Sequence, residues 1–119
     1  MSEVRFGGWS GIENRRHRRV PLQVPIECRH SQQRVLAKVE NISLSGLLVR
    51  CSAPFAQDEE VSVSFTMPDS SVAISSIARV AHLVPGAFVG LEFTRLSPED
   101  RKEIERYVAI SVPVENPNS

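Results

Sequence analysis

Five consecutive positions near the start of the chain hold four arginines. They are Arg15, Arg16, Arg18 and Arg19, with His17 between the two pairs. A guanidinium group is always charged, and its planar fork bonds bidentately to phosphate or to the O6 and N7 edge of guanine. The cluster therefore has the chemistry of a phosphate- or guanine-binding site. A solvated basic tail is the alternative, because blocks of like charge are often tails.

A short polar stretch, Asn-Ile-Ser-Leu-Ser-Gly, occupies residues 41–46. Asn and Ser side chains hydrogen-bond the nearby backbone and favour turns, and Gly adopts backbone angles that other residues avoid. The simplest interpretation is a connection between two strands. The functional interpretation is that Asn41 and Ser43 point polar groups outward while Gly46 lets backbone or a ligand come close.

The chain has 119 residues, which is enough for one domain with one modest core. Its 14 basic and 14 acidic residues give a formal net charge of zero. Up to Arg34, however, seven basic residues stand against three acidic ones, a local balance of +4, and the remainder carries −4. A basic head on a neutral whole favours capture of a local anion over binding of a long duplex, which needs a broad basic face.

Apolar and polar residues alternate along most of the chain, as in half-buried strands. We expect six strands, at residues 20–28, 35–39, 47–49, 61–67, 72–83 and 88–93. In the first strand, Pro21 and Pro25 fall opposite the apolar face, which indicates an edge strand or irregular pairing. Around Ser75 and Ser76 the alternation slips, which predicts a bulge or bend at that point.

After the strands the hydrophobic period changes to that of a helix. Ser97 is a good N-cap, Pro98 suits the first helical position, and two acids follow at the positive end of the helix dipole. Ile104, Tyr107 and Val108 fall at helical spacing. The predicted fold is all-β: a six-stranded antiparallel β-barrel with a C-terminal α-helix. Residues 13–112 form the domain, between a flexible glycine-rich arm, 1–12, and a disordered tail, 113–119.

The sequence gives little support for catalysis or metal binding. No base–nucleophile constellation occurs, and no histidine has a second ligand at metal spacing, so we expect neither an enzyme nor a metal site. Cys28 and Cys51 lack paired spacing, and we expect reduced, buried thiols in a cytoplasmic protein, although a disulfide between neighbouring strands stays open. We find no signal peptide and no segment long enough to span a membrane.

Taken in order, the two polar motifs resemble the two-part signature of PilZ domains, bacterial receptors for cyclic di-GMP (c-di-GMP). The motifs are Arg15-x-x-x-Arg19 and Asn41-x-Ser43-x-x-Gly46. Residues 89–93 are similar to the last barrel strand of that family, and residues 97–107 to the helix that closes the barrel. The resemblance covers roughly residues 13–110 and implies the PilZ-like barrel and helix.

The resemblance also implies a site and a role. Arg15 and Arg19 would clasp phosphate and guanine of c-di-GMP, with Arg16 as a further contact. Asn41 and Ser43 would bond guanine or hold an arginine in place, and Gly46 would allow the close turn. Asn41 departs from the more common Asp, and so lacks a carboxylate for the guanine N1 and N2 donors.

The implied function is an adaptor in which c-di-GMP repositions residues 1–19 and so signals to an effector protein. We expect no nucleic-acid partner, no membrane insertion, and a monomer or weak dimer. Two alternatives stay open. One is a PilZ-fold interaction module that does not bind nucleotide, and the other is a small barrel that binds single-stranded nucleic acid, although such barrels display several aromatic residues on a strand face.

Overall fold

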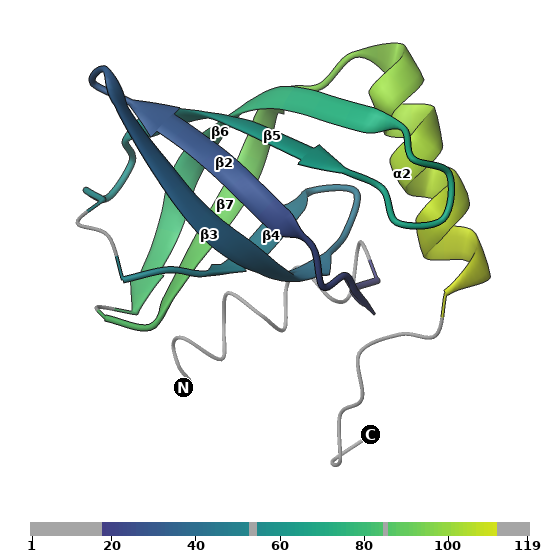
Figure 1. Ribbon diagram of the computed structural model, residues 1–119, viewed down its shortest axis with the longest axis horizontal. Helices are drawn as coiled ribbons and strands as arrows, with labels where there is room; N and C mark the ends of the chain where they lie inside the picture. Colours follow the sequence, from purple (N-terminus) through teal and green to yellow (C-terminus); the bar gives the residue numbers. More distant parts are fainter. Residues whose placement is uncertain (1–17, 53–54, 85, 112–119) are drawn as a thin grey trace, which may run out of the picture.

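The computed structural model describes residues 18–52, 55–84 and 86–111. These residues form seven strands and one helix (Figure 1). The elements are β1 (Val20–Pro21), β2 (Pro25–His30), β3 (Gln33–Ile42), β4 (Gly46–Arg50), β5 (Glu60–Thr66), β6 (Ala73–Val84), β7 (Phe88–Arg95) and α2 (Pro98–Ile110). The expected arm, residues 1–12, and the expected tail, 113–119, lie outside the described residues.

The strands form a single antiparallel sheet in the order β1-β3-β2-β5-β6-β7-β4. An additional pairing of β3 with β4 closes six of them into a barrel, and β1 is an extra strand beside the end of β3. The predicted six-stranded antiparallel barrel with a C-terminal helix is therefore confirmed. Closure satisfies the backbone groups that an open sheet would leave at its edges.

The first predicted strand is interrupted in the structure. All five apolar residues of its alternating face are buried, but residues 22–24 separate β1 from β2. The reason is the pair of prolines, which have no N–H to donate to a ladder: Pro21 ends β1, and Pro25 begins β2. The irregular pairing falls on β1, while β2 is an interior strand between β3 and β5.

The predicted bulge at Ser75 and Ser76 is placed wrongly. The alternation continues through β6, and Ser76 is 8% exposed and faces inward. A hydroxyl is acceptable there because it donates to the carbonyl oxygens of Ile77, at 3.1 Å, and Arg95. The register shifts come later, between Ile77 and Ala78 and between Val80 and His82.

Both cysteines are buried thiols, as expected, and no disulfide joins them. Burial, followed by the influence of Cys51, raises the pKa of the Cys28 thiol to about 12. Desolvation disfavours the charged thiolate, so Cys28 behaves as a small apolar core residue.

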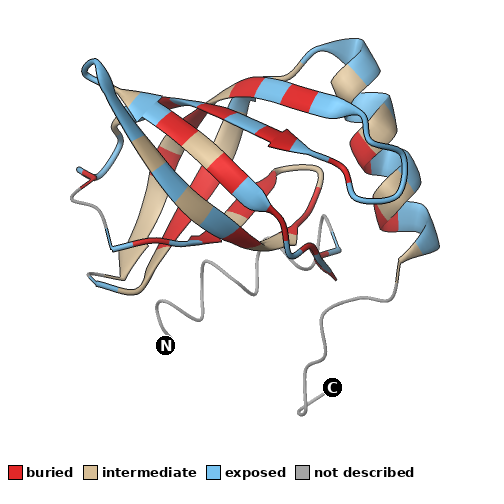
Figure 2. Cartoon of the chain, in the orientation of Figure 1, coloured by how far each residue is buried: buried red, intermediate tan, exposed pale blue. Residues whose placement is uncertain are grey.

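Helix α2 lies across one end of the barrel (Figure 1). It begins as predicted, with Pro98 in its first turn and with the Ser97 hydroxyl accepting from the N–H of Asp100 at 3.0 Å. Ile104 and Val108 are buried. Figure 2 shows buried segments of α2 on its side toward the barrel. No helix among the described residues is long and apolar enough to cross a membrane.

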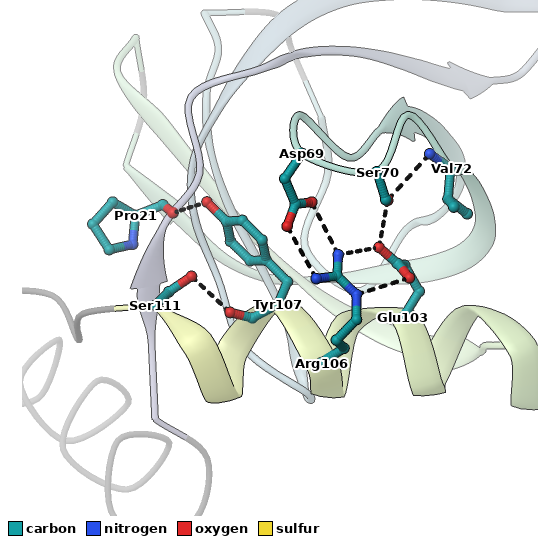
Figure 3. Close-up of polar contacts among 8 residues, drawn as sticks. All are labelled: Pro21, Asp69, Ser70, Val72, Glu103, Arg106, Tyr107 and Ser111. Carbon is teal, nitrogen blue, oxygen red and sulfur yellow. Dashed lines mark hydrogen bonds and ion pairs between the residues drawn. The ribbon is translucent and has the colours of Figure 1, made fainter.

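Polar contacts fix α2 at two points (Figure 3). The Arg106 guanidinium makes a two-pronged contact with Asp69 of the β5–β6 turn, at 2.9 and 3.0 Å, and also bonds Glu103 at 2.6 Å. Arg106 lowers the pKa of both carboxyls. The hydroxyl of the next residue, Tyr107, donates to the carbonyl oxygen of Pro21 in β1 at 2.9 Å. The helix is thus attached directly to the segment that follows the arginine cluster.

Candidate functional site

The structure brings the last arginine of the cluster against the first residue of the polar motif. Arg19 immediately precedes β1, and β1 pairs with the end of β3 so that Pro21 lies opposite Asn41. The Arg19 Nη1 donates to the Asn41 Oδ1 at 2.8 Å. Arg19 is only 7% exposed, and Asn41 is half-buried. The last residue of the first motif and the first residue of the second therefore meet on the barrel.

A local irregularity of β3 precedes this contact. The pairing of β3 with β4 shifts register between Val39 and Asn41. Such a bulge places an extra residue in one strand and changes the direction of the side chain that follows it. Asn41 lies in β3 rather than in the turn that the sequence indicated. A charge as buried as that of Arg19 needs hydrogen-bond partners, and the amide oxygen of Asn41 is one.

Ser43 does not point outward as expected, because its side chain is wholly buried. Its hydroxyl oxygen accepts from the Ser45 N–H at 3.1 Å and lies 2.8 Å from the Ser45 hydroxyl. Its own N–H donates to the carbonyl oxygen of Gly46 at 2.9 Å. Short hydroxyl side chains often form local bonds of this type in turns. Ser43 therefore fixes the shape of the β3–β4 turn.

Gly46 begins β4 and lies opposite Glu92 of β7. A Cβ atom at this position would lie 1.9 Å from the carbonyl oxygen of Leu91. Of the two expectations for this glycine, backbone or ligand, the structure shows the close approach of a backbone. The absence of a side chain is required for β4 and β7 to pair.

Arg15 and Arg16 lie outside the described residues. Arg18 is exposed, and its Nη2 donates to the carbonyl oxygen of Ser111 at 3.0 Å, just beyond α2. With the Tyr107–Pro21 bond, this is the second contact between the segment around Arg19 and the end of the helix.

Sequence reasoning did not identify the residues beside this site. By register, Asn41 lies opposite Leu48 of β4, Leu48 opposite Gly90 of β7, and Gly90 opposite His82 of β6. This row extends from Asn41 across three further strands. One feature of the sequence could have indicated this row. Gly90 lies in the interior of a predicted strand, and a glycine at such a position often marks a place where another group comes close.

A charged cluster lies on the neighbouring part of β3 and β4. The Glu40 carboxylate accepts from Arg50 Nε at 2.7 Å and from Gln23 at 3.1 Å, and these bonds lower the pKa of Glu40. The Arg50 guanidinium lies 4.9 Å above the centre of the Phe88 ring. The Glu40 carboxylate and the Phe88 ring both compensate the charge of Arg50. Within the described residues, no group of three or more potential metal ligands occurs.

The described residues form a small antiparallel β-barrel domain with a C-terminal helix at one end, and Arg19 is bonded to Asn41 near the end of β3. The sequence matches the PilZ domain over residues 13–109, and the chain belongs to this family. A search of curated proteins gives no match.

Solved structures of other proteins have a similar fold. The Bacillus subtilis inhibitor of motility, MotI/DgrA, superposes with a TM-score of 0.72 at 16% identity, over 79% of this chain and 49% of that one. The PilZ domain of YcgR from Escherichia coli with c-di-GMP gives 0.66 at 11% identity, over 79% and 88%. The MrkH–c-di-GMP complex of K. pneumonia gives 0.65 at 16%, over 79% and 49%. The chain thus spans about half the length of MotI/DgrA and MrkH.

Proposed function

We propose that the chain is a receptor for c-di-GMP. The proposed ligand site consists of Arg15, Arg16, Arg19, Asn41, Ser43 and Gly46. The observation that carries this proposal is the hydrogen bond between Arg19 and Asn41, which joins the two halves of the PilZ signature at one place. Membership of the PilZ family supports it, and so does the presence of c-di-GMP in two of the similar structures.

The residues divide the work by their chemistry. The guanidinium forks of Arg15 and Arg19 bond phosphate oxygens and the O6 and N7 edge of guanine, each charge-assisted bond contributing about 1.5–3 kcal/mol. Asn41 orients Arg19 before the ligand arrives, which reduces the entropy lost on binding. Ser43 and Gly46 act through the backbone, since they set the turn and the strand pairing that place Asn41.

Isothermal titration calorimetry of the full chain with c-di-GMP tests this proposal. We expect saturable binding with a micromolar or lower dissociation constant, which corresponds to roughly 8 kcal/mol or more. Cyclic di-AMP is the matched control, because it has the same phosphates but no guanine O6, and it should bind at least tenfold more weakly. Absence of heat with c-di-GMP would favour a PilZ-fold interaction module, and equal binding of both ligands would rule out guanine recognition.

We further propose that the ligand acts as a switch by repositioning residues 1–19, so that the surface offered to an effector protein changes. The bonds from Arg18 to Ser111 and from Tyr107 to Pro21 support a link to α2, because a shift of Arg19 would pull on both. In this role the chain is an adaptor that signals to the effector protein through a change in its own surface.

Trp9 provides a reporter for this change, because it is the only tryptophan and lies within the segment proposed to move. Saturation with c-di-GMP should shift or quench Trp9 emission by more than about a tenth when excited at wavelengths that the nucleotide does not absorb. Cyclic di-AMP at the same concentration is the control. Full occupancy by calorimetry without a change in emission would contradict the repositioning of the arm while leaving binding intact.

A further inference from the structure

A hollow of about 730 Å³ lies on the barrel at a distance in sequence and register from Arg19 and Asn41. Its floor and rims come from β2, β5, β6 and the end of β7. One row of cross-strand partners runs along it, from Arg29 to Ser62, from Ser62 to Ile77, and from Ile77 to Arg95. Arginine thus stands at both ends of a row whose middle is small or apolar.

The surface is hollowed at this place because small serine side chains occupy its outward positions. Ser62, Ser64 and Ser75 all line it and are exposed, where strands more often place β-branched or aromatic residues. Their hydroxyls make no hydrogen bond to the part of the chain that the structure describes. They are therefore available to donate to, or accept from, the backbone of a bound chain.

Arg29 and Arg95, which line the hollow, and Arg34, which is paired with Arg29, make few side-chain contacts. Arg29 uses Nε to bond Glu27 at 2.7 Å, and the side chains of Arg34 and Arg95 make no hydrogen bond or ion pair within the described residues. Arg34 lies directly opposite Arg29 in the β2–β3 ladder. Like charges directly opposite each other destabilise a sheet. Elsewhere on the barrel, Arg50 and Arg79 are each paired with carboxylates.

We propose that this surface, the Arg29–Arg95 groove, docks an extended acidic segment of a partner protein. Three strand intervals separate the two arginines along the sheet, which is about 14 Å. An extended chain covers this distance in about four residues. The fitting segment has two carboxylates about four positions apart, each received by a guanidinium fork, with a small apolar side chain over Ile77 between them.

Nucleic acid fits this surface less well. The lining contains no aromatic side chain for base stacking. Binding to a phosphate backbone requires a broad basic face, whereas this groove has guanidinium groups only at its ends. A carboxylate pair with a defined separation matches both the spacing and the local charge.

The test uses the full chain, labelled with ¹⁵N, and a blocked seven-residue peptide with two glutamates four positions apart and a valine midway. We expect millimolar binding, with amide shifts gathered at the groove residues and absent around Asn41. The same peptide with glutamines in place of the glutamates should bind at least fivefold more weakly, as should the native peptide to the double variant R29Q/R95Q. Arg101→Gln, which removes an exposed arginine from α2, should bind as the native chain does.

A second variant tests the shape of the Arg29–Arg95 groove independently of its charge. Ser64→Tyr fills the hollow without changing any charge, and tyrosine is well suited to strands, so the barrel should remain folded. It should weaken the peptide at least fivefold. Equal binding by a lysine peptide, no effect of R29Q/R95Q, or tighter binding of a single-stranded oligonucleotide at the same amides would overturn the proposal. Because these titrations need no c-di-GMP, and calorimetry with c-di-GMP should be unchanged in R29Q/R95Q, their failure is separate from a failure of the nucleotide site.

Discussion

Replacement of Arg19 by alanine is expected to weaken c-di-GMP binding at least tenfold, measured by calorimetry. Arg19 is 7% exposed and its guanidinium is held by Asn41, so its contacts with a ligand form without further ordering. A charge-assisted bond of about 1.5–3 kcal/mol corresponds to roughly 10- to 100-fold in affinity. Arg15→Ala should have a similar effect, because the second fork serves the same ligand.

Controls must distinguish lost contacts from lost folding, since Arg19→Ala also leaves the half-buried Asn41 oxygen without this donor. Arg19→Lys keeps the charge but not the planar fork, and we expect an intermediate affinity with nearly native thermal stability. Arg101→Ala removes an exposed arginine from α2 and should leave binding unchanged. Titration heats that are unchanged in both Arg15→Ala and Arg19→Ala would refute the proposed site.

Replacement of Gly46 by alanine is expected to lower the free energy of unfolding by about 3 kcal/mol or more, measured by urea denaturation. The added Cβ would lie 1.9 Å from the Leu91 carbonyl oxygen, and the obstacle is backbone that no rotamer change can move. To accept the methyl group, β4 must separate from β7, which opens the barrel. Total stabilities of about 5–15 kcal/mol are typical, so much of the native state would be lost.

Gly86→Ala is the matched control for this effect. Gly86 has φ +77° and no atom within 4 Å of an added Cβ, so alanine meets only the backbone penalty of about 1–2 kcal/mol. Gly46→Ala should therefore be clearly the more damaging of the two. If Gly46→Ala is as stable as the native chain and reduces only c-di-GMP affinity, the glycine serves the ligand rather than the barrel.

The sequence alone determined the elements of this protein and the order of its motifs. Alternation gave the inward faces, including the complete set around β5, and Ser97 with Pro98 located the start of α2. These features are readable because they depend on neighbours in the chain: a side chain two residues away in a strand, or an N–H three residues away in a helix. The two motifs also identified the PilZ family for the same local reason.

Only the tertiary structure decided how these local features combine. Pairing of β1 with β3 places Arg19 beside Asn41. Pairing of β4 with β7 explains why position 46 must be glycine. The β3–β4 turn buries Ser43, which we expected from the sequence to point outward. Likewise, Arg29 and Arg95 are far apart in the chain and fall into one row only through three successive strand ladders. Registers of this type are set by closure of the barrel, a constraint on all six strands together that no short stretch of sequence contains.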